Sequence, residues 1–263
     1  KGSIYGIIGF SGAGKSTLVR TMNVLQRPTS GTVTFNGTTI STLGEGRLLP
    51  LRRKIAMIFQ HFNLMPSRTV LDNVTLPLIH EKVSRKDARA KAMHLLELVG
   101  IADKAKAYPR QLSGGQQQRV AIARALITKP SLVFADEPTG NLDSVSSAEV
   151  LSFLKRSVKE LGQTVIMVTH DAVAASYADR AIVFADGQIV ADEQRPTAES
   201  MNQLLMNERE RATQLVGGPS VGTTVPRPPV AALKGHAEKA SLVPGAPSVP
   251  GAPQHAAVAQ HRR

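Results

Sequence analysis

Short apolar runs bounded by turn residues alternate along the chain with segments whose apolar residues recur at helical spacing. Four of these runs have the length of a buried strand: Ile4–Ile8, Ile55–Phe59, Leu132–Ala135 and Thr164–Thr169. The segments Thr17–Leu25 and Ser146–Leu161 are predicted as helices, and Gly162 ends the second. Strands that alternate with helices in this way predict an α/β fold with parallel strands and covering helices.

Two further patterns predict smaller subdomains. The sequence Val33-Thr-Phe-Asn36-Gly37 is typical of a β-hairpin, as is Asp186-Gly187 later in the chain. Residues 61 to 128 turn helical, with a capping box at Ser84 and Asp87 and a helix end at Gly100. We therefore predict an antiparallel β subdomain and a helical subdomain, at about 61–128, inserted into the α/β core.

The composition changes at Gly217. Residues 217–263 hold eight of the chain's sixteen prolines, many alanines and no aromatic residue. Such a segment cannot bury enough apolar surface to offset the entropy of ordering. We predict a folded domain over residues 1–216 and a disordered Pro/Ala-rich tail over 217–263.

The chain carries a net charge of +12, of which the tail contributes +4. The remaining basic residues are scattered and have few aromatic neighbours on which bases could stack. This pattern favours a solvated basic surface facing lipid headgroups or a nucleotide, and we expect no nucleic-acid partner. The chain has no cysteine, which fits a reducing cytosol. No apolar run is long enough to span a bilayer, so we expect membrane association only through a partner.

A glycine-rich loop follows the first predicted strand and precedes the first predicted helix. It reads Gly9-Phe-Ser-Gly-Ala-Gly14-Lys15-Ser16. Glycines let successive backbone N–H groups converge on phosphate, and the helix N-terminus adds positive potential. Lys15 is expected to reach the β and γ phosphates of a nucleotide, and Ser16 to offer its hydroxyl to Mg²⁺.

Two carboxylates, Asp136 and Glu137, end the apolar run that starts at Leu132. The ends of parallel strands form the ligand-bearing edge of an α/β sheet. Asp136 is expected to hold Mg²⁺ through water, and Glu137 to polarise the attacking water. Taken alone, such a pair also fits a solvated strand end, and the nearby phosphate loop favours the catalytic interpretation.

A second glycine-containing helix start, Leu112-Ser-Gly-Gly-Gln-Gln-Gln-Arg119, offers another anion-binding N-terminus. With this motif the sequence resembles the ABC ATPase family over residues 1 to about 215. The resemblance implies a P-loop NTPase core with an antiparallel β subdomain and an inserted helical subdomain. It also implies that Ser113 and Gly115 contact the γ phosphate held by a second copy, so that ATP closes a homodimer.

Three other positions match motifs of the same family. Gln60 corresponds to a glutamine that senses Mg²⁺ and the nucleophilic water, Asp143 lies in a loop that crosses the dimer interface, and His170 corresponds to a histidine that contacts the γ phosphate. Each also has a simpler interpretation: a strand cap, a helix N-cap and a histidine satisfied at a strand end. The other six histidines lack paired metal-ligand spacing.

The resemblance defines the expected site. The catalytic residues would be Glu137, His170 and Gln60, and the Mg²⁺ ligands Ser16, Gln60 and Asp136. The residues that contact ATP would be Gly9, Ser11, Gly12, Ala13, Gly14, Lys15, Ser16, Thr17, Ser113, Gly114, Gly115 and Asp143.

The chain departs from the family at its start. It begins eight residues before Gly9, whereas the family carries an adenine-stacking aromatic residue about twenty-five positions before this loop. We therefore expect that the first strands of the β subdomain are missing and that the β subdomain is truncated at its N-terminal side.

Different parts of the chain resemble different transporters. Residues 1 to about 110, especially Met57–Met65, resemble methionine importer ATPases, whereas residues from about 131 resemble ATPases of lipoprotein-releasing, macrolide-exporting and cell-division complexes. The resemblance implies transmembrane permease subunits, a substrate-binding protein if the system imports, and a peripheral position on the cytoplasmic face of the membrane. A regulator that gates a membrane partner and a soluble ABC protein of DNA repair or translation remain alternatives.

Overall fold

A six-stranded sheet forms the centre of the structure, a computed structural model that describes residues 2–79 and 81–217. In spatial order its strands are β4 (Ile55–Ile58), β5 (Leu132–Asp136), β6 (Val165–Thr169), β1 (Ile4–Ile8), β7 (Arg180–Ala185) and β8 (Gln188–Gln194). The first five are parallel, and β8 is antiparallel to β7. The predicted α/β fold with parallel strands is therefore confirmed.

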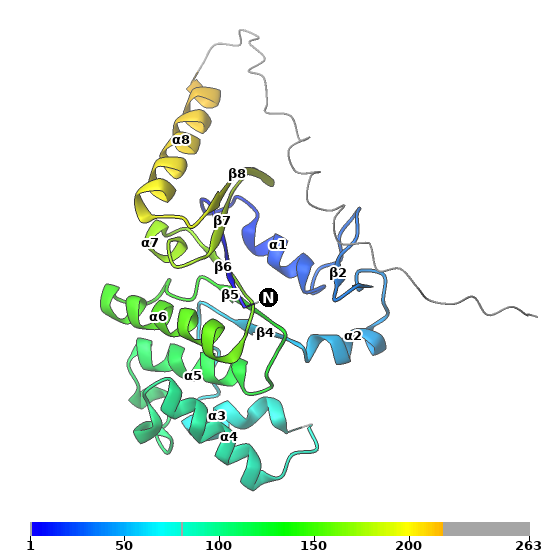
Figure 1. Ribbon diagram of the computed structural model, residues 1–263, viewed down its shortest axis with the longest axis vertical. Coiled ribbons are helices and arrows are strands. Elements are labelled where there is room, and N and C mark those ends of the chain that lie inside the picture. Colours follow the sequence, from blue (N-terminus) through cyan, green and yellow to red (C-terminus); the bar gives the residue numbers. More distant parts are fainter. Residues whose placement is uncertain (1, 80, 218–263) are drawn as a thin grey trace, which may run out of the picture. The chain divides into compact units, whose positions relative to one another are not determined.

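Helices cover both faces of this sheet (Figure 1). On one face Val19 of α1 (Lys15–Met22) packs with Ile7 and Phe134. On the other face α5 (Gly114–Leu126) and α6 (Ser144–Leu161) pack against residues such as Val133. Alternate residues of one strand thus point into different layers of the core, as a fully buried strand requires.

Helices occupy the segment 61–128 that the sequence predicts as a helical subdomain, although α5, at the end of this segment, packs against the sheet. The segment contains α3 (Val70–Thr75) and α4 (Arg85–Leu98), with the short 3₁₀ turns η1 (Leu76–Leu78), η2 (Ala102–Lys104) and η3 (Pro109–Gln111). Ser84 caps α4 by accepting from the Asp87 N–H, but the Asp87 carboxylate accepts from the Ser84 hydroxyl instead of the Ser84 backbone. Half of the predicted capping box therefore forms. Gly100, at φ +70°, follows the end of α4.

The small β subdomain consists of β2 (Thr34–Phe35) and β3 (Thr38–Thr39), joined by Asn36-Gly37 with positive φ at both residues. A separate apolar cluster of Val24, Ile40 and Leu48 joins this hairpin to α2 (Glu45–Arg52). The predicted hairpin is confirmed, as is the one at Asp186-Gly187 between β7 and β8.

The last described element was not predicted. α8 (Ala198–Gly217) follows β8, and its Met201 and Leu205 pack against Ala172 and Ala175 of the short helix α7 (Ala172–Ala175). The predicted tail lies outside the described residues except for Gly217, so its disorder stays a prediction. Within the described part of the chain, no helix combines the length and apolar character needed to cross a bilayer.

Candidate nucleotide-binding site

The phosphate loop turns sharply between β1 and α1, and two glycines make the turn possible. A Cβ on Gly9 would lie 2.1 Å from the Phe184 carbonyl oxygen of β7, so no other residue fits there without moving the backbone. Gly14 has φ +97° and precedes α1, whose first turn has no side-chain cap. The backbone N–H groups at this helix start are therefore free of side-chain acceptors and can bind an anion.

Lys15 lies inside the curve of this loop. It is only 7% exposed, and its Nζ donates to the Gly9 and Phe10 carbonyls at 2.7 and 2.9 Å. Burial lowers the pKa of Lys15, while the nearby Glu137 and Asp136 carboxylates act in the opposite direction. A polyphosphate would supply the counter-charge that this partly desolvated ammonium group needs.

Ser16 and Asp136 come together at the end of β5. The Ser16 hydroxyl donates to Asp136 Oδ1 at 3.4 Å. Burial, followed by repulsion from Glu137, raises the pKa of Asp136, and the hydrogen bond from Ser16 lowers it. A hydroxyl and a carboxylate are hard oxygen ligands of the kind that Mg²⁺ accepts beside substrate phosphates, so these residues fit the predicted metal.

Glu137 and His170 form the second pair at the same sheet edge. His170 Nδ1 lies 2.9 Å from Glu137 Oε1, and the Glu137 side chain is 16% exposed against 62% for His170. The Glu137 backbone has φ +48°, which is uncommon for a residue with a side chain, and its N–H donates to the Val168 carbonyl of β6. The neighbouring strand thus fixes the direction in which this carboxylate points.

The Gln60 side chain makes its hydrogen bond outside these pairs. Its Nε2 donates to Asn141 Oδ1 at 3.4 Å, and no hydrogen bond joins it to Ser16 or Asp136 among residues 2–79 and 81–217. The structure therefore brings together Lys15, Ser16 and the two carboxylates, while Gln60 is bonded to the loop that follows them. Its role as a metal ligand stays a prediction.

Ser113 and Asp143 both cap helices. The Ser113 hydroxyl accepts from the Gln116 N–H, and the Gln116 side chain accepts from the Ser113 N–H, so α5 begins with a complete capping box. Asp143 accepts from the N–H groups of Val145 and Ser146 at the start of α6, and the bond from Ser146 lowers its pKa. The helix-cap interpretation of Asp143 is thus realised, without excluding contact with a second copy.

Two side chains of α5 that sequence reasoning missed bind the loops that follow β4 and β5. Gln118 is fully buried, and its Nε2 donates to the carbonyls of Pro138 at 2.7 Å and Phe59 at 3.4 Å. Arg124 donates to the Phe62 and Asn63 carbonyls. A signal existed for Gln118, because it shares the apolar face of α5 with Gly115 and Ile122.

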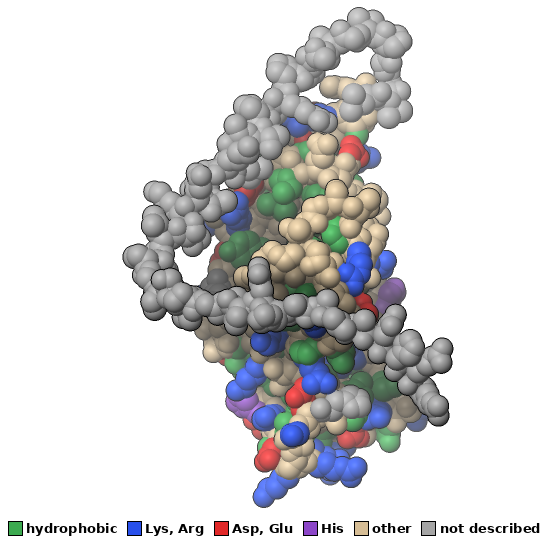
Figure 2. All heavy atoms as spheres, turned by 90° about the vertical axis from the view of Figure 1, so that its right-hand side faces the viewer, with side chains coloured by type: hydrophobic (Ala, Val, Ile, Leu, Met, Phe, Trp, Pro, Cys, Tyr) green, Lys and Arg blue, Asp and Glu red, His purple; other side chains and the backbone are tan. Residues whose placement is uncertain are grey.

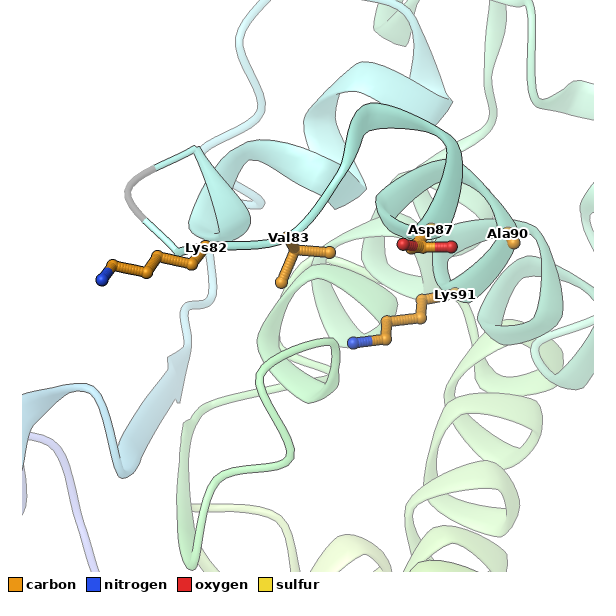
Figure 3. A pocket seen from close by; sticks show the side chains of 5 residues that line it. All are labelled: Lys82, Val83, Asp87, Ala90 and Lys91. Carbon is orange, nitrogen blue, oxygen red and sulfur yellow. The ribbon is translucent and has the colours of Figure 1, made fainter.

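A cavity also lies away from the predicted site residues. This shallow cavity of about 380 Å³ opens beside α4 and is lined by Lys82, Val83, Asp87, Ala90 and Lys91, none of them a predicted site residue (Figure 3). Figure 2 shows Lys and Arg side chains spread over the face in view rather than gathered in one stripe. This distribution agrees with the expected solvated basic surface.

A glycine loop between a buried strand and a helix, with carboxylates at the end of a neighbouring parallel strand, defines a phosphate-binding P-loop domain. The family model described as "ABC transporter" matches residues 1–140. The chain belongs to the ABC transporter family.

Curated relatives extend the match. The chain is 52% identical over 199 residues to "Methionine import ATP-binding protein MetN 1" of Lactiplantibacillus plantarum, covering 75% of this chain and 56% of the relative. It is 46% identical over 225 residues to "Methionine import ATP-binding protein MetN 2" of Rhodococcus jostii, covering 82% and 66%. The chain thus spans between about half and two thirds of the length of these relatives.

Solved structures agree with the fold. The dimeric structure of MJ0796, described as a bacterial ABC transporter cassette, superposes with a TM-score of 0.68 at 40% identity and covers 74% of this chain and 86% of that one. Structure cbiO1 from Clostridium perfringens, part of the complex cbiONQ, gives a TM-score of 0.70 at 29% identity, covering 82% and 84%. The predicted P-loop core with its subdomains is confirmed.

The match to methionine import proteins is not limited to the first half of the chain. An alignment of 199 residues within 263 necessarily passes through the stretch after residue 131. The resemblance of residues from about 131 to lipoprotein-releasing, macrolide-exporting and cell-division ATPases stays a prediction. The identity over the whole aligned length favours the methionine importers.

Proposed function

We propose that this chain binds and hydrolyses ATP to power an ABC transporter, and that the transporter imports methionine. The observation that carries the proposal is the convergence of Lys15, Ser16, Asp136 and Glu137 at one edge of the parallel sheet. The 46–52% identity to methionine import ATP-binding proteins supports the choice of substrate.

Binding of ATP would use groups that already converge. The backbone N–H groups around Gly12 and Gly14 and the start of α1 would hold the phosphates. Lys15 Nζ would turn from the Gly9 and Phe10 carbonyls toward the β and γ phosphates. Mg²⁺, held by Ser16 and Asp136, would neutralise charge on these phosphates when bound.

Hydrolysis would use the second pair. Glu137 would accept a hydrogen bond from the attacking water and align it with the γ phosphate. His170, bonded to Glu137 at 2.9 Å, would keep the carboxylate in one orientation and contact the γ phosphate from its exposed side. The left-handed backbone of Glu137 limits the directions that its side chain can take.

The partners follow from the same proposal. A second copy would contribute Ser113 and Gly115, in keeping with the dimeric form of the related cassette MJ0796. Transmembrane permease subunits would dock on the region between about Gln60 and Arg110, at the cytoplasmic face of the membrane, and a substrate-binding protein would deliver methionine. No nucleic-acid partner is proposed.

The first prediction tests hydrolysis. Glu137→Gln keeps the side-chain shape but removes the charge that orients water, so turnover should fall by about 10²–10⁴-fold while ATP binding persists. Steady-state phosphate release and equilibrium binding of ATP measure the two effects. Glu160→Gln, an exposed change on α6, is the matched control and should leave both unchanged. Wild-type turnover in Glu137→Gln would remove this residue from the proposed role.

The choice of transporter needs a second experiment. Residues 136–143 (Asp-Glu-Pro-Thr-Gly-Asn-Leu-Asp) resemble lipoprotein-release, macrolide-export and division ATPases, which supports the alternative function. Co-purification with permeases of each type, followed by ATPase assays, separates the two. We expect stimulation by a methionine-type permease, and selective stimulation by an exporter-type subunit would favour the alternative.

A further inference from the structure

The side chain of Asn141 is bonded to the segment that carries Gln60. Its Nδ2 lies 3.0 Å from the Gln60 carbonyl oxygen and 3.2 Å from His61 Nδ1, and its Oδ1 accepts from Gln60 Nε2 at 3.4 Å. One exposed side chain thus contacts both the backbone and the side chain of the residue predicted to sense the metal.

Gly140 provides the surface on which the Gln60 side chain lies. A Cβ on Gly140 would come within 2.9 Å of Gln60 Nε2 and 3.3 Å of its Cδ and Cγ. These atoms belong to the far end of a flexible side chain, and Gly140 does not have the positive φ that would exclude alanine. An added methyl group at this position should displace Gln60 rather than disrupt the fold.

The rest of the Gln60 loop is held from the other side. Gln118 binds the Phe59 carbonyl, and Arg124 binds the carbonyls of Phe62 and Asn63. Because helix α5 anchors the backbone before and after Gln60, the side chain of Gln60 is the part that can exchange partners at the smallest cost.

We propose that Gly140 and Asn141 form a seat for Gln60, defined by the contacts above, and that this seat competes with the metal site for the Gln60 amide. Asn141 is then a positioning residue for the proposed ATP hydrolysis, on which this inference rests. In this proposal the Gln60 side chain, held at Asn141 through its Nε2, has to move before its Oε1 can ligate Mg²⁺, so the seat weakens metal-dependent nucleotide binding. The loop of Gly140 and Asn141 also contains Asp143, which couples the position of Gln60 to a segment expected at the dimer interface.

Two variants weaken the seat by different routes. Asn141→Ala removes the polar contacts, and Gly140→Ala fills the space that Gln60 occupies. Asn141→Ala should tighten Mg²⁺-dependent binding of a non-hydrolysable ATP analogue about fivefold, the effect of one net hydrogen bond. Gly140→Ala should tighten it in the same direction, because the added methyl group displaces the Gln60 side chain. Binding of the analogue in excess chelator should not change. Asn207→Ala, an exposed change on α8, and Gly44→Ala, where a Cβ meets open space, are the matched controls.

A double-mutant cycle separates the seat from a general structural role. In a Gln60→Ala background neither Asn141→Ala nor Gly140→Ala should alter Mg²⁺-dependent binding, because the side chain that they release is absent. Hydrogen exchange of the loop Gln60–Met65 without nucleotide gives a second readout, and Asn141→Ala should accelerate it.

The outcomes are distinct. Two results would overturn the proposed competition. In one, Asn141→Ala and Gly140→Ala tighten binding of the ATP analogue equally with and without the Gln60 side chain. In the other, neither variant tightens this binding. Unchanged hydrogen exchange in Asn141→Ala would overturn the seat itself. If the wild-type chain bound no ATP analogue, the proposed function would fail, and the competition with it.

Discussion

Gly9, directly after β1, approaches β7 so closely that the Phe184 backbone occupies the space for a side chain at Gly9. Gly9→Ala would place a Cβ 2.1 Å from the Phe184 carbonyl oxygen, so the backbone has to move directly beside the last β1–β7 pair, Ile8 and Val183. We predict a loss of stability of about 3 kcal/mol and loss of ATP binding, since overpacking against backbone is costly.

Thermal or denaturant unfolding of Gly9→Ala checks this second prediction. Gly44→Ala is the control, because Gly44 has φ −71° and its Cβ would meet nothing within 4 Å. It should stay within about 0.5 kcal/mol of the wild type. A Gly9→Ala chain as stable as the control would show that the loop adjusts more freely than this geometry allows.

Asp136 gives a pH-dependent prediction. Burial and the neighbouring Glu137 raise its pKa in the folded state, so the native chain binds more protons than the unfolded chain between the two pKa values. By linkage, the contribution of Asp136 to stability falls as pH rises through this window and is least favourable above the folded pKa. Asp136→Asn should therefore raise Tm slightly at neutral pH, and the gain should shrink as the pH is lowered.

The same variant should lose Mg²⁺-dependent nucleotide binding, because it removes the charged ligand. Calorimetric unfolding over a pH series and binding titrations with and without Mg²⁺ measure the two effects. A gain in Tm that grew on acidification would contradict the sign derived from the raised pKa, whatever the effect on binding.

The sequence predicts the positions of some residues of the site but not of others. Lys15 and Ser16 follow from a local motif, since a strand, a glycine loop and a helix fix their positions. The contacts of Asn141 and Arg124 with the Gln60 loop join residues more than sixty positions apart and depend on how irregular loops fold. No spacing in the sequence encodes such bonds between a side chain and a distant backbone.

At the scale of elements, helix α5 connects the expected parts of the site. It is capped by Ser113, anchors the Gln60 loop through Arg124 and reaches the residue after Glu137 through Gln118. A displacement of this helix would therefore be transmitted to both loops, which makes α5 more than a covering helix.

Gln118→Met tests this connection. It preserves the length of the side chain but removes the N–H groups that bind the Pro138 and Phe59 carbonyls. We expect a loss of stability of about 1–3 kcal/mol, the usual cost of a buried carbonyl left without a donor. Turnover should fall more than ATP binding, because the loops at Glu137 and Gln60 lose their common anchor.

The control for Gln118→Met is Gln117→Met, one position earlier on α5. Within the described part of the chain, the Gln117 side chain donates to one group, the Leu112 carbonyl near the start of its own helix, so the change should cost less than about 1 kcal/mol. Denaturant unfolding and steady-state kinetics compare the two variants. Equal effects at both positions would show that α5 has no special link to the catalytic loops.

The sequence predicts the strands of the parallel sheet, where burial gives a strong apolar pattern, and misses α8, where the apolar pattern is weak. The central strands β1, β5 and β6 are largely buried on both faces, with Tyr5 of β1 exposed, and read as apolar runs. α8 buries mainly Met201 and Leu205, so its apolar spacing is sparse, although Thr197 and Ser200 cap its start reciprocally. The capping pattern at Thr197 was the signal available for this helix.

At the scale of the whole molecule, the chain has two helix N-termini that are expected to bind an anion. Gly14 precedes α1 beside Lys15, and Ser113 caps α5 within another part of the same chain. One ATP needs only one phosphate loop, so the second start is expected to serve the ATP of a second copy. Sequence could suggest this arrangement through family resemblance, but a single chain contains no intersubunit contact from which to derive it.

The last prediction separates the two roles of Ser113. Asp and Asn both cap helices about as well as Ser, so Ser113→Asp and Ser113→Asn should leave the stability of α5 nearly unchanged. Only Asp adds a negative charge where the partner's γ phosphate is expected. Ser113→Asp should therefore lower turnover at least about a hundredfold, as removal of an oxyanion-stabilising donor does, and prevent ATP-induced dimerisation.

A single chain of Ser113→Asp should still bind ATP with the affinity of the wild type, because its own Lys15 and phosphate loop are intact. Binding at low protein concentration, size exclusion with ATP and phosphate release measure the three quantities, and Ser113→Asn serves as the neutral control. Mixing Ser113→Asp with Lys15→Ala should restore part of the activity, since each mixed dimer rebuilds one complete site. Loss of ATP binding by Ser113→Asp monomers, or no recovery in the mixture, would contradict a site shared between two copies.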